Sequence, residues 1–245
     1  MFQRVCYKKL AKKQLKGRRF TAVAAVFISL LLLMLASSIT NFSESSSPDF
    51  SKTENIAFIE ETSSEYYFKS FETSTSPLDE IAFLLNLAIL GITEVALCHL
   101  FNVYFCKPEE KILFGEFLKG FSLWLKGFLS ILWVSLWTFL WSLLFIIPGI
   151  VKGFSYSQCF MIIAENPGIS VRKALKISKT MTDGFKSDLF VMCLSFIGWE
   201  ILSVFTLFIL QLWLIPYKRM AFTNAYKDMK SQAIKKGILS PDDFK

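Results

Sequence analysis

Long apolar stretches alternate with polar segments along the chain. Three of them, residues 20–40, 81–105 and 127–147, carry at most one charged side chain each and are long enough to cross a bilayer. About 20 apolar residues are needed to span the hydrocarbon core as a helix. Backbone that faces lipid must also satisfy its own hydrogen bonds, which a single helix does. The pattern therefore predicts an all-α, polytopic helical membrane protein.

Two further apolar tracts are harder to interpret. Residues 151–164 lie between Pro148-Gly149 and the turn signal at 165–168, which predicts a short fourth span. Residues 189–216 would form a helix about 42 Å long, too long for one upright span and short for two. A hairpin near Thr206 gives a fifth span at about 188–205 and a sixth at about 207–226. The alternative is one long tilted helix over 188–216.

The distribution of basic residues favours the hairpin. Of 27 Lys and Arg residues, eight lie in 1–19 and seven in 217–245, whereas the loop at 41–80 has two basic residues and nine acidic ones. Cytoplasmic flanks carry the excess of Lys and Arg, so both termini are expected inside and the polar, acidic loop outside. This requires an even number of spans. We expect about six transmembrane helices, five of them within 81–226, and a basic cytoplasmic tail at 227–245.

Three segments have the pattern of interfacial amphipathic helices. Residues 1–19 place Phe2, Val5, Cys6, Leu10 and Leu15 against eight basic residues, and segments 109–125 and 170–182 are similar, the latter with Ser170 as N-cap. We expect these segments to lie on anionic phospholipid headgroups, with no nucleic-acid partner. The residues predicted to contact lipid are Lys8, Lys9, Lys12, Lys13, Arg172, Lys173, Lys176 and Lys179.

The first span has an alternative interpretation as a cleaved signal peptide, because basic residues precede it and Ala36-x-Ser38 resembles a cleavage site. Its apolar stretch is longer than the 7–15 residues or so of a typical signal peptide. We therefore expect it to be retained as a membrane anchor.

Composition supports a membrane protein and argues against most catalytic chemistry. Of 245 residues, 53% are apolar and 19% are charged, and the mean hydropathy is +0.45. The chain has one His and five Cys, none of them in a C-x-x-C pair, and it lacks the phosphate-binding loop and H-E-x-x-H motifs. We therefore expect no catalytic residues, no cofactor and no metal, and we interpret the cysteines as small apolar side chains.

Five ionisable residues fall inside the predicted spans: Glu94, His99, Lys152, Glu200 and Lys218. Charged groups at this depth are costly, so they mark either an internal ion pair or a functional pathway. By estimated depth, Glu94 is expected to pair with Lys218, and Glu200 with Lys152. His99 is rotated by about 140° from Glu94 on the same helix, which argues against a shared proton relay.

The second half of the chain contains a series of sequence motifs that together suggest a family. Its motifs are the run 143–152 (LLFIIPGIVK), Tyr156-Ser157, Ala164-Glu165-Asn166-Pro167, Ala174-Leu175 with Ser178, the run 194–199 (LSFIGW) and the run 212–217 (LWLIPY). This pattern, together with the start of the chain, resembles the bacterial integral-membrane family catalogued as domain of unknown function 975. The resemblance implies a multi-span protein of the bacterial cytoplasmic membrane with no established catalytic residues.

Two functions are compatible with these observations. The first is a non-enzymatic accessory or assembly factor that contacts lipid and a membrane-protein partner of unknown identity through its basic cytoplasmic face. The second is a small-solute or lipid transporter whose polar site uses the five intramembrane residues. The two differ in one respect: a transport site predicts a water-accessible cavity lined by at least two of those residues, whereas the accessory role predicts a dry bundle with each group reaching to an interface.

Overall fold

The computed structural model describes residues 2–46, 77–108, 110, 112, 114–144, 146–207 and 209–244. This part of the chain is helical and contains no strand, so the predicted all-α class is confirmed. Most of the predicted outer loop, residues 47–76, lies outside the described residues. Its two edges are helical rather than loop, because α2 continues to Ser46 and α4 begins at Pro77.

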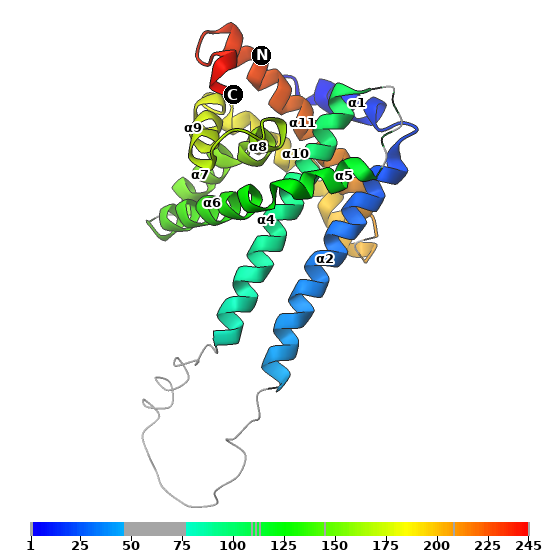
Figure 1. Cartoon of the computed structure of the whole chain (residues 1–245). Coiled ribbons are helices and arrows are strands. Elements are labelled where there is room, and N and C mark those ends of the chain that lie inside the picture. Colours follow the sequence, from blue (N-terminus) through cyan, green and yellow to red (C-terminus); the bar gives the residue numbers. More distant parts are fainter. Residues whose placement is uncertain are drawn as a thin grey trace, which may run out of the picture.

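Helices α2 (Arg19–Ser46) and α4 (Pro77–Cys106) pack side by side and extend well beyond the rest of the molecule (Figure 1). Many of their large apolar side chains are exposed along this extension. They include Phe27, Leu31, Met34 and Leu35 on α2 and Ile81, Phe83, Leu84 and Leu85 on α4. Such a surface is unfavourable in water and is typical of helices that face lipid.

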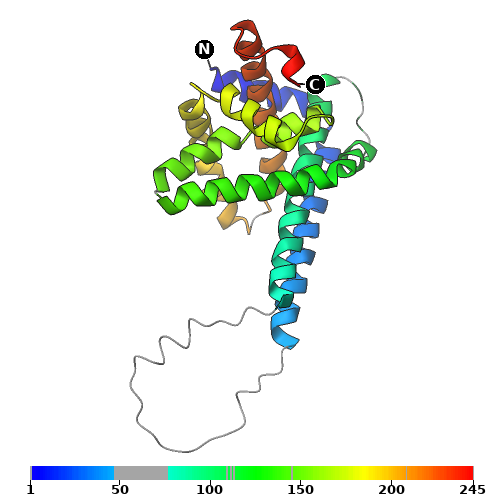
Figure 2. The same ribbon diagram turned by 60° about the vertical axis from the view of Figure 1, so that its left-hand side comes forward.

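Helix α6 (Trp124–Leu144), which follows the short α5 (Gly115–Gly120) and a 3₁₀ turn (Phe121–Leu123), runs across α4 instead of alongside it. Both views show this crossing (Figures 1 and 2). Two glycines allow it: a Cβ added to Gly91 would lie 2.4 Å from the Gly127 carbonyl oxygen, and one on Gly127 would lie 2.7 Å from that of Gly91. The backbones therefore touch where the two helices cross.

The predicted fourth span at 151–164 is wrong as a single helix. The chain forms α7 (Ile146–Tyr156), which packs against α6, and then a separate α8 (Cys159–Glu165). Eleven helical residues extend only about 16 Å, which is too short to cross the hydrocarbon core. Two polar residues, Ser157 and Gln158, separate α7 from α8. The Gln158 side chain donates a hydrogen bond to Ser157 Oγ at 2.9 Å.

The predicted hairpin near Thr206 is confirmed. Helix α10 (Lys186–Phe205) ends there, Leu207 adopts a left-handed φ of 49°, and α11 (Gln211–Lys235) begins after the turn. A single helix over 188–216 is therefore excluded. A short 3₁₀ turn (Pro241–Phe244) follows α11.

Within the described residues, four helical segments are long and apolar enough to cross a membrane: Arg19–Ala36, Phe83–Cys106, Gly115–Leu143 and Lys186–Phe205. They match four of the six predicted spans. The other two do not meet this criterion, because 151–164 is broken and α11 begins only at Gln211 and carries charged side chains from Lys218 onward.

The first helix, α1 (Arg4–Gln14), packs on α11, and both chain termini lie at the end of the molecule opposite the α2 and α4 extension (Figure 1). Its buried stripe is Tyr7, Ala11 and Leu15, spaced by four residues. Of the predicted apolar face, Leu15 is buried, whereas Val5, Cys6 and Leu10 are exposed and their contact with the lipid surface stays a prediction. Tyr7 and Ala11, which are not part of the predicted face, are buried by the packing of α1 on α11.

The other two predicted amphipathic segments differ in outcome. Residues 170–182 form α9 (Val171–Met181), and Ser170 caps it by accepting a hydrogen bond from the Lys173 backbone N–H, as predicted. Helix α9 buries Ala174, Ile177 and Met181 against the body and exposes Lys176 and Lys179. In the segment 109–125, regular helix begins only at Gly115.

Candidate functional site

The carboxylate of Glu94 on α4 accepts two hydrogen bonds from the guanidinium of Arg219 on α11. The predicted pairing of Glu94 with Lys218 was therefore wrong, and the actual partner is the next residue, Arg219. Adjacent helical positions differ by 100° in direction, so only one of the pair Lys218 and Arg219 can face α4. A signal for Arg219 was present in the sequence, because its planar guanidinium suits bidentate binding of a carboxylate better than an ammonium does.

This pair lines a cavity of about 290 Å³. Its walls are mainly apolar, with Leu90, Ile131 and Phe160, and its other polar groups are Ser157 and Cys98. The two side chains retain some exposure, 23% for Glu94 and 31% for Arg219. The positive and negative groups neutralise each other inside the cavity, so neither is left as an isolated charge.

Glu200 on α10 pairs with Lys218, whose Nζ lies 2.9 Å from Oε1, and accepts a hydrogen bond from Gln211 at 2.7 Å. The predicted pairing of Glu200 with Lys152 was therefore wrong. Lys152 lies on α7 with its Nζ 4.5 Å from the centre of the Trp141 ring, a cation–π arrangement. The hairpin turn brings Lys218 and Gln211 back beside Glu200, which the sequence could not specify.

His99 lies on the part of α4 that contacts α8. Its Nδ1 is 3.4 Å from the Ala164 carbonyl oxygen, and its Nε2 is 3.9 Å from Glu116, too far for a hydrogen bond. It is therefore apart from the Glu94 pair, as its rotation on the helix predicted.

The five predicted intramembrane residues thus occupy four separate environments. Of the five, only Glu94 lines the cavity that it shares with Arg219. Each of the two acids has a cationic partner on α11. This arrangement fixes α4 and α10 against α11.

A cluster that the sequence analysis missed lies where α8 meets α11. Glu165 accepts hydrogen bonds from Tyr226 and Lys227, and Lys230 lies 3.0 Å away. Burial of Glu165 opposes its ionisation, but the hydrogen bond from Tyr226 and the two ammonium groups outweigh burial and hold the pKa of Glu165 below its usual value. The only sequence signal was the four-residue spacing of Tyr226 and Lys230, which places them on one side of α11.

The basic residues predicted to contact lipid are not equivalent. Lys8 is partly buried, because its Nζ bonds the Ser195 carbonyl oxygen at 3.2 Å and lies 4.0 Å from the centre of the Phe196 ring. Arg172 lies over Trp133 at 5.3 Å. The side chains of Lys9, Lys12, Lys13, Lys176 and Lys179 are exposed, and Lys173 is partly exposed. Lys8 is thus occupied within the fold, whereas the exposed lysines remain accessible.

Within the described ranges, no group of three or more His, Cys, Asp and Glu side chains lies close enough together to hold a metal ion. Cys98 and Cys159 are buried, which agrees with their interpretation as small apolar side chains, whereas Cys6 and Cys106 are exposed and Cys193 is partly buried.

Residues 142–233 match the family model described as Protein of unknown function (DUF975). The resemblance seen in the sequence is thereby confirmed over this stretch. It contains Glu165, Glu200, Lys218 and Arg219, whereas Glu94 lies outside it. Comparison with curated proteins and with solved structures gave no match.

Proposed function

We propose that the protein is a non-enzymatic, multi-span protein of the bacterial cytoplasmic membrane that acts as an accessory or assembly factor. In this proposal the ionisable residues within the membrane hold the helices together. The functional contacts, to anionic lipid and to a membrane-protein partner, are made by exposed basic residues on the cytoplasmic side.

The observation that carries the proposal is the separate pairing of the two intramembrane acids. Glu94 is neutralised by Arg219 and Glu200 by Lys218, in different environments. A proton- or ion-coupled site needs groups that gain and lose charge along a shared pathway. Acids that are each hydrogen-bonded to a cation are better suited to fixing helix register.

The proposed orientation draws support from the position of the termini. Both lie at the same end of the molecule (Figure 1), and both flanking segments are rich in Lys and Arg. A reporter that is active only in the cytoplasm, fused after Lys245, should be active. An inactive fusion would contradict the proposed topology.

A flux assay separates the accessory role from transport. The purified protein in proteoliposomes with an internal pH-sensitive dye should show the same proton leak as the Glu94→Gln variant and as vesicles without protein. A leak that requires Glu94 would overturn the proposal in favour of a coupled transporter.

The partner interaction is tested by the size of the native complex in cross-linked membranes. We expect a defined complex larger than the monomer that is lost in Lys176→Glu/Lys179→Glu on the exposed side of α9. The matched control is Lys235→Glu/Lys236→Glu, which makes the same charge change at the exposed end of α11. Equal losses in both variants, or a monomer throughout, would contradict the role of the α9 surface.

A further inference from the structure

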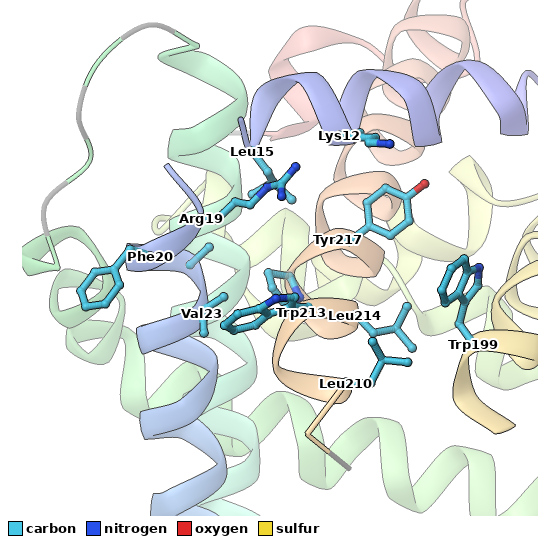
Figure 3. Close-up of a pocket in the computed structure, with 12 residues that line it drawn as sticks. Lys12, Leu15, Arg19, Phe20, Val23, Trp199, Leu210, Trp213, Leu214 and Tyr217 are labelled. Carbon is cyan, nitrogen blue, oxygen red and sulfur yellow. The ribbon is translucent and has the colours of Figure 1, made fainter. Parts of the chain in front are cut away.

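A groove of about 670 Å³ lies between the N-terminal segment and the helices α10 and α11. The end of α1 and the start of α2 form one side, and α10 and the first turns of α11 form the other (Figure 3). Its volume falls within the range of about 300–1,000 Å³ that is common for ligand pockets. None of the intramembrane acids described above lines it.

The groove is basic at one end. Lys12 and Arg19 line it next to α1, and both side chains are exposed. Figure 3 shows the Tyr217 ring below Lys12, with its hydroxyl directed to the same end. No Asp or Glu is among the residues that line the groove. This end therefore has an uncompensated positive charge and a hydroxyl donor, a combination that attracts phosphate groups.

The remainder of the groove is apolar. In Figure 3, Trp213 of α11 lies next to Val23 of α2, and Leu210 and Leu214 lie between Trp213 and Trp199 of α10. Trp199 is 53% exposed and Trp213 is 64% exposed, so these rings are open to whatever surrounds the protein. The residues run from a charged end to an apolar end in the same order as the parts of a phospholipid.

We propose that this groove binds one anionic phospholipid from the surrounding bilayer. Lys12 and Arg19 contact its phosphate and headgroup, and the acyl chains lie over Val23, Trp199 and Trp213. The proposal goes beyond the accessory role and depends only on the location of the protein in a membrane.

The charge distribution favours a lipid over a helix from a second copy of the chain. A helix that filled the apolar walls would leave the two cations at the end of the groove without a counter-charge, and two copies would bring like charges together. An anionic lipid supplies the phosphate and the apolar chains in one molecule. A Lys or Arg side chain near an anionic headgroup attracts it electrostatically. Two such side chains together raise the affinity for the lipid roughly thirtyfold.

Native mass spectrometry of the detergent-solubilised full chain tests the proposal, with phosphatidylglycerol and phosphatidylcholine titrated in turn. We expect one phosphatidylglycerol per monomer under conditions that remove loosely associated lipid. Lys12→Gln/Arg19→Gln should weaken this binding at least tenfold. Lys13→Gln/Lys16→Gln removes the same charge from exposed positions nearby that do not line the groove, and it should retain binding.

A second variant tests the apolar part and keeps both cations. Val23→Trp adds bulk to the groove wall, so it should also lose the bound lipid. Because Val23 is only partly buried, a normal circular dichroism spectrum should accompany the loss. Retention of lipid by this variant would place the binding outside the groove and overturn the proposal.

Three other results would also overturn it. Equal losses in Lys12→Gln/Arg19→Gln and in Lys13→Gln/Lys16→Gln would indicate general electrostatic attraction instead of a site. Equal binding of phosphatidylcholine would remove the role of the two cations. A dimer without lipid, abolished by Val23→Trp, would make the groove an interface between copies.

Discussion

Arg219 on α11 binds Glu94 on α4 with two hydrogen bonds, although 125 residues of sequence separate them. The pair joins the helix next to the N-terminal span to the last long helix of the chain. It lies in a largely apolar cavity, where either charge alone would be poorly solvated.

Loss of one partner should therefore cost more than loss of both. Glu94→Gln and Arg219→Met are each expected to lower the free energy of unfolding by about 3 kcal/mol, and Glu94→Gln/Arg219→Met should recover at least half of the summed loss. Unfolding of the purified variants in detergent, followed by circular dichroism, measures this. Glu110→Gln, in an exposed pair with Lys107, serves as the control and should change little. Additive losses would show that the two residues do not interact.

Glu200 should couple to Lys218 and not to Lys152. A double-mutant cycle of Glu200→Gln with Lys218→Met is expected to give a coupling of about 0.5–1 kcal/mol, since both side chains remain partly exposed. The cycle with Lys152→Met is the matched comparison and should give none. A coupling to Lys152 of similar size would contradict the positions of Lys152 beside Trp141 and of Glu200 beside Lys218.

The crossing of α4 and α6 should tolerate no side chain larger than hydrogen at Gly91 or Gly127. Gly91→Ala and Gly127→Ala each place a Cβ against backbone of the other helix, which cannot move away as a side chain would. We expect a loss of about 2 kcal/mol or more in each variant. Gly198→Ala on α10 is the control, because nothing lies within 4 Å of its Cβ position, and it should be neutral or stabilising by up to about 1 kcal/mol. Equal behaviour of the three variants would argue against the close crossing.

Acid should destabilise the junction of α8 and α11. The pKa of Glu165 is lowered in the folded protein, so its contribution is complete above the ordinary glutamate value of about 4.3 and is lost as the pH falls through the lower folded value. Stability should decrease over this acidic range in the parent protein. Glu165→Gln should be less stable by about 2 kcal/mol at pH 7 and should show a weaker pH dependence. An unchanged pH profile in this variant would mean that other carboxylates cause the acid effect.

Local features of the fold were predictable from the sequence. The end of α10 near Thr206 followed from the length of the apolar tract and the charge of the C-terminal segment, and Ser170 was identified as an N-cap from its position before α9. Both depend on interactions within one or two turns of helix or on the bilayer thickness.

Relationships between distant helices were not predictable in the same way. The choice of Arg219 over Lys218 depends on the rotation of α11 against α4, and the burial of Tyr7 depends on the packing of α1 on α11. Likewise, 127–147 was predicted as a span by its composition, whereas its crossing of α4 depends on the approach of Gly91 and Gly127. The hydropathy of a segment indicates whether it lies in an apolar environment. It does not indicate the angle at which the segment packs on other helices.

The packing of α1 on α11 has a consequence for how the protein is made. Tyr7 donates a hydrogen bond to Asp228, 221 residues later, and Asn224 donates one to Gln14. Helix α1 leaves the ribosome well before α11, because 221 residues separate Tyr7 from Asp228. Until α11 is made, Tyr7 and Ala11 lack the helix that buries them, and a basic amphipathic helix can lie on the headgroup layer of a membrane in the meantime. The contact between α1 and α11 can therefore form only in a late stage of folding.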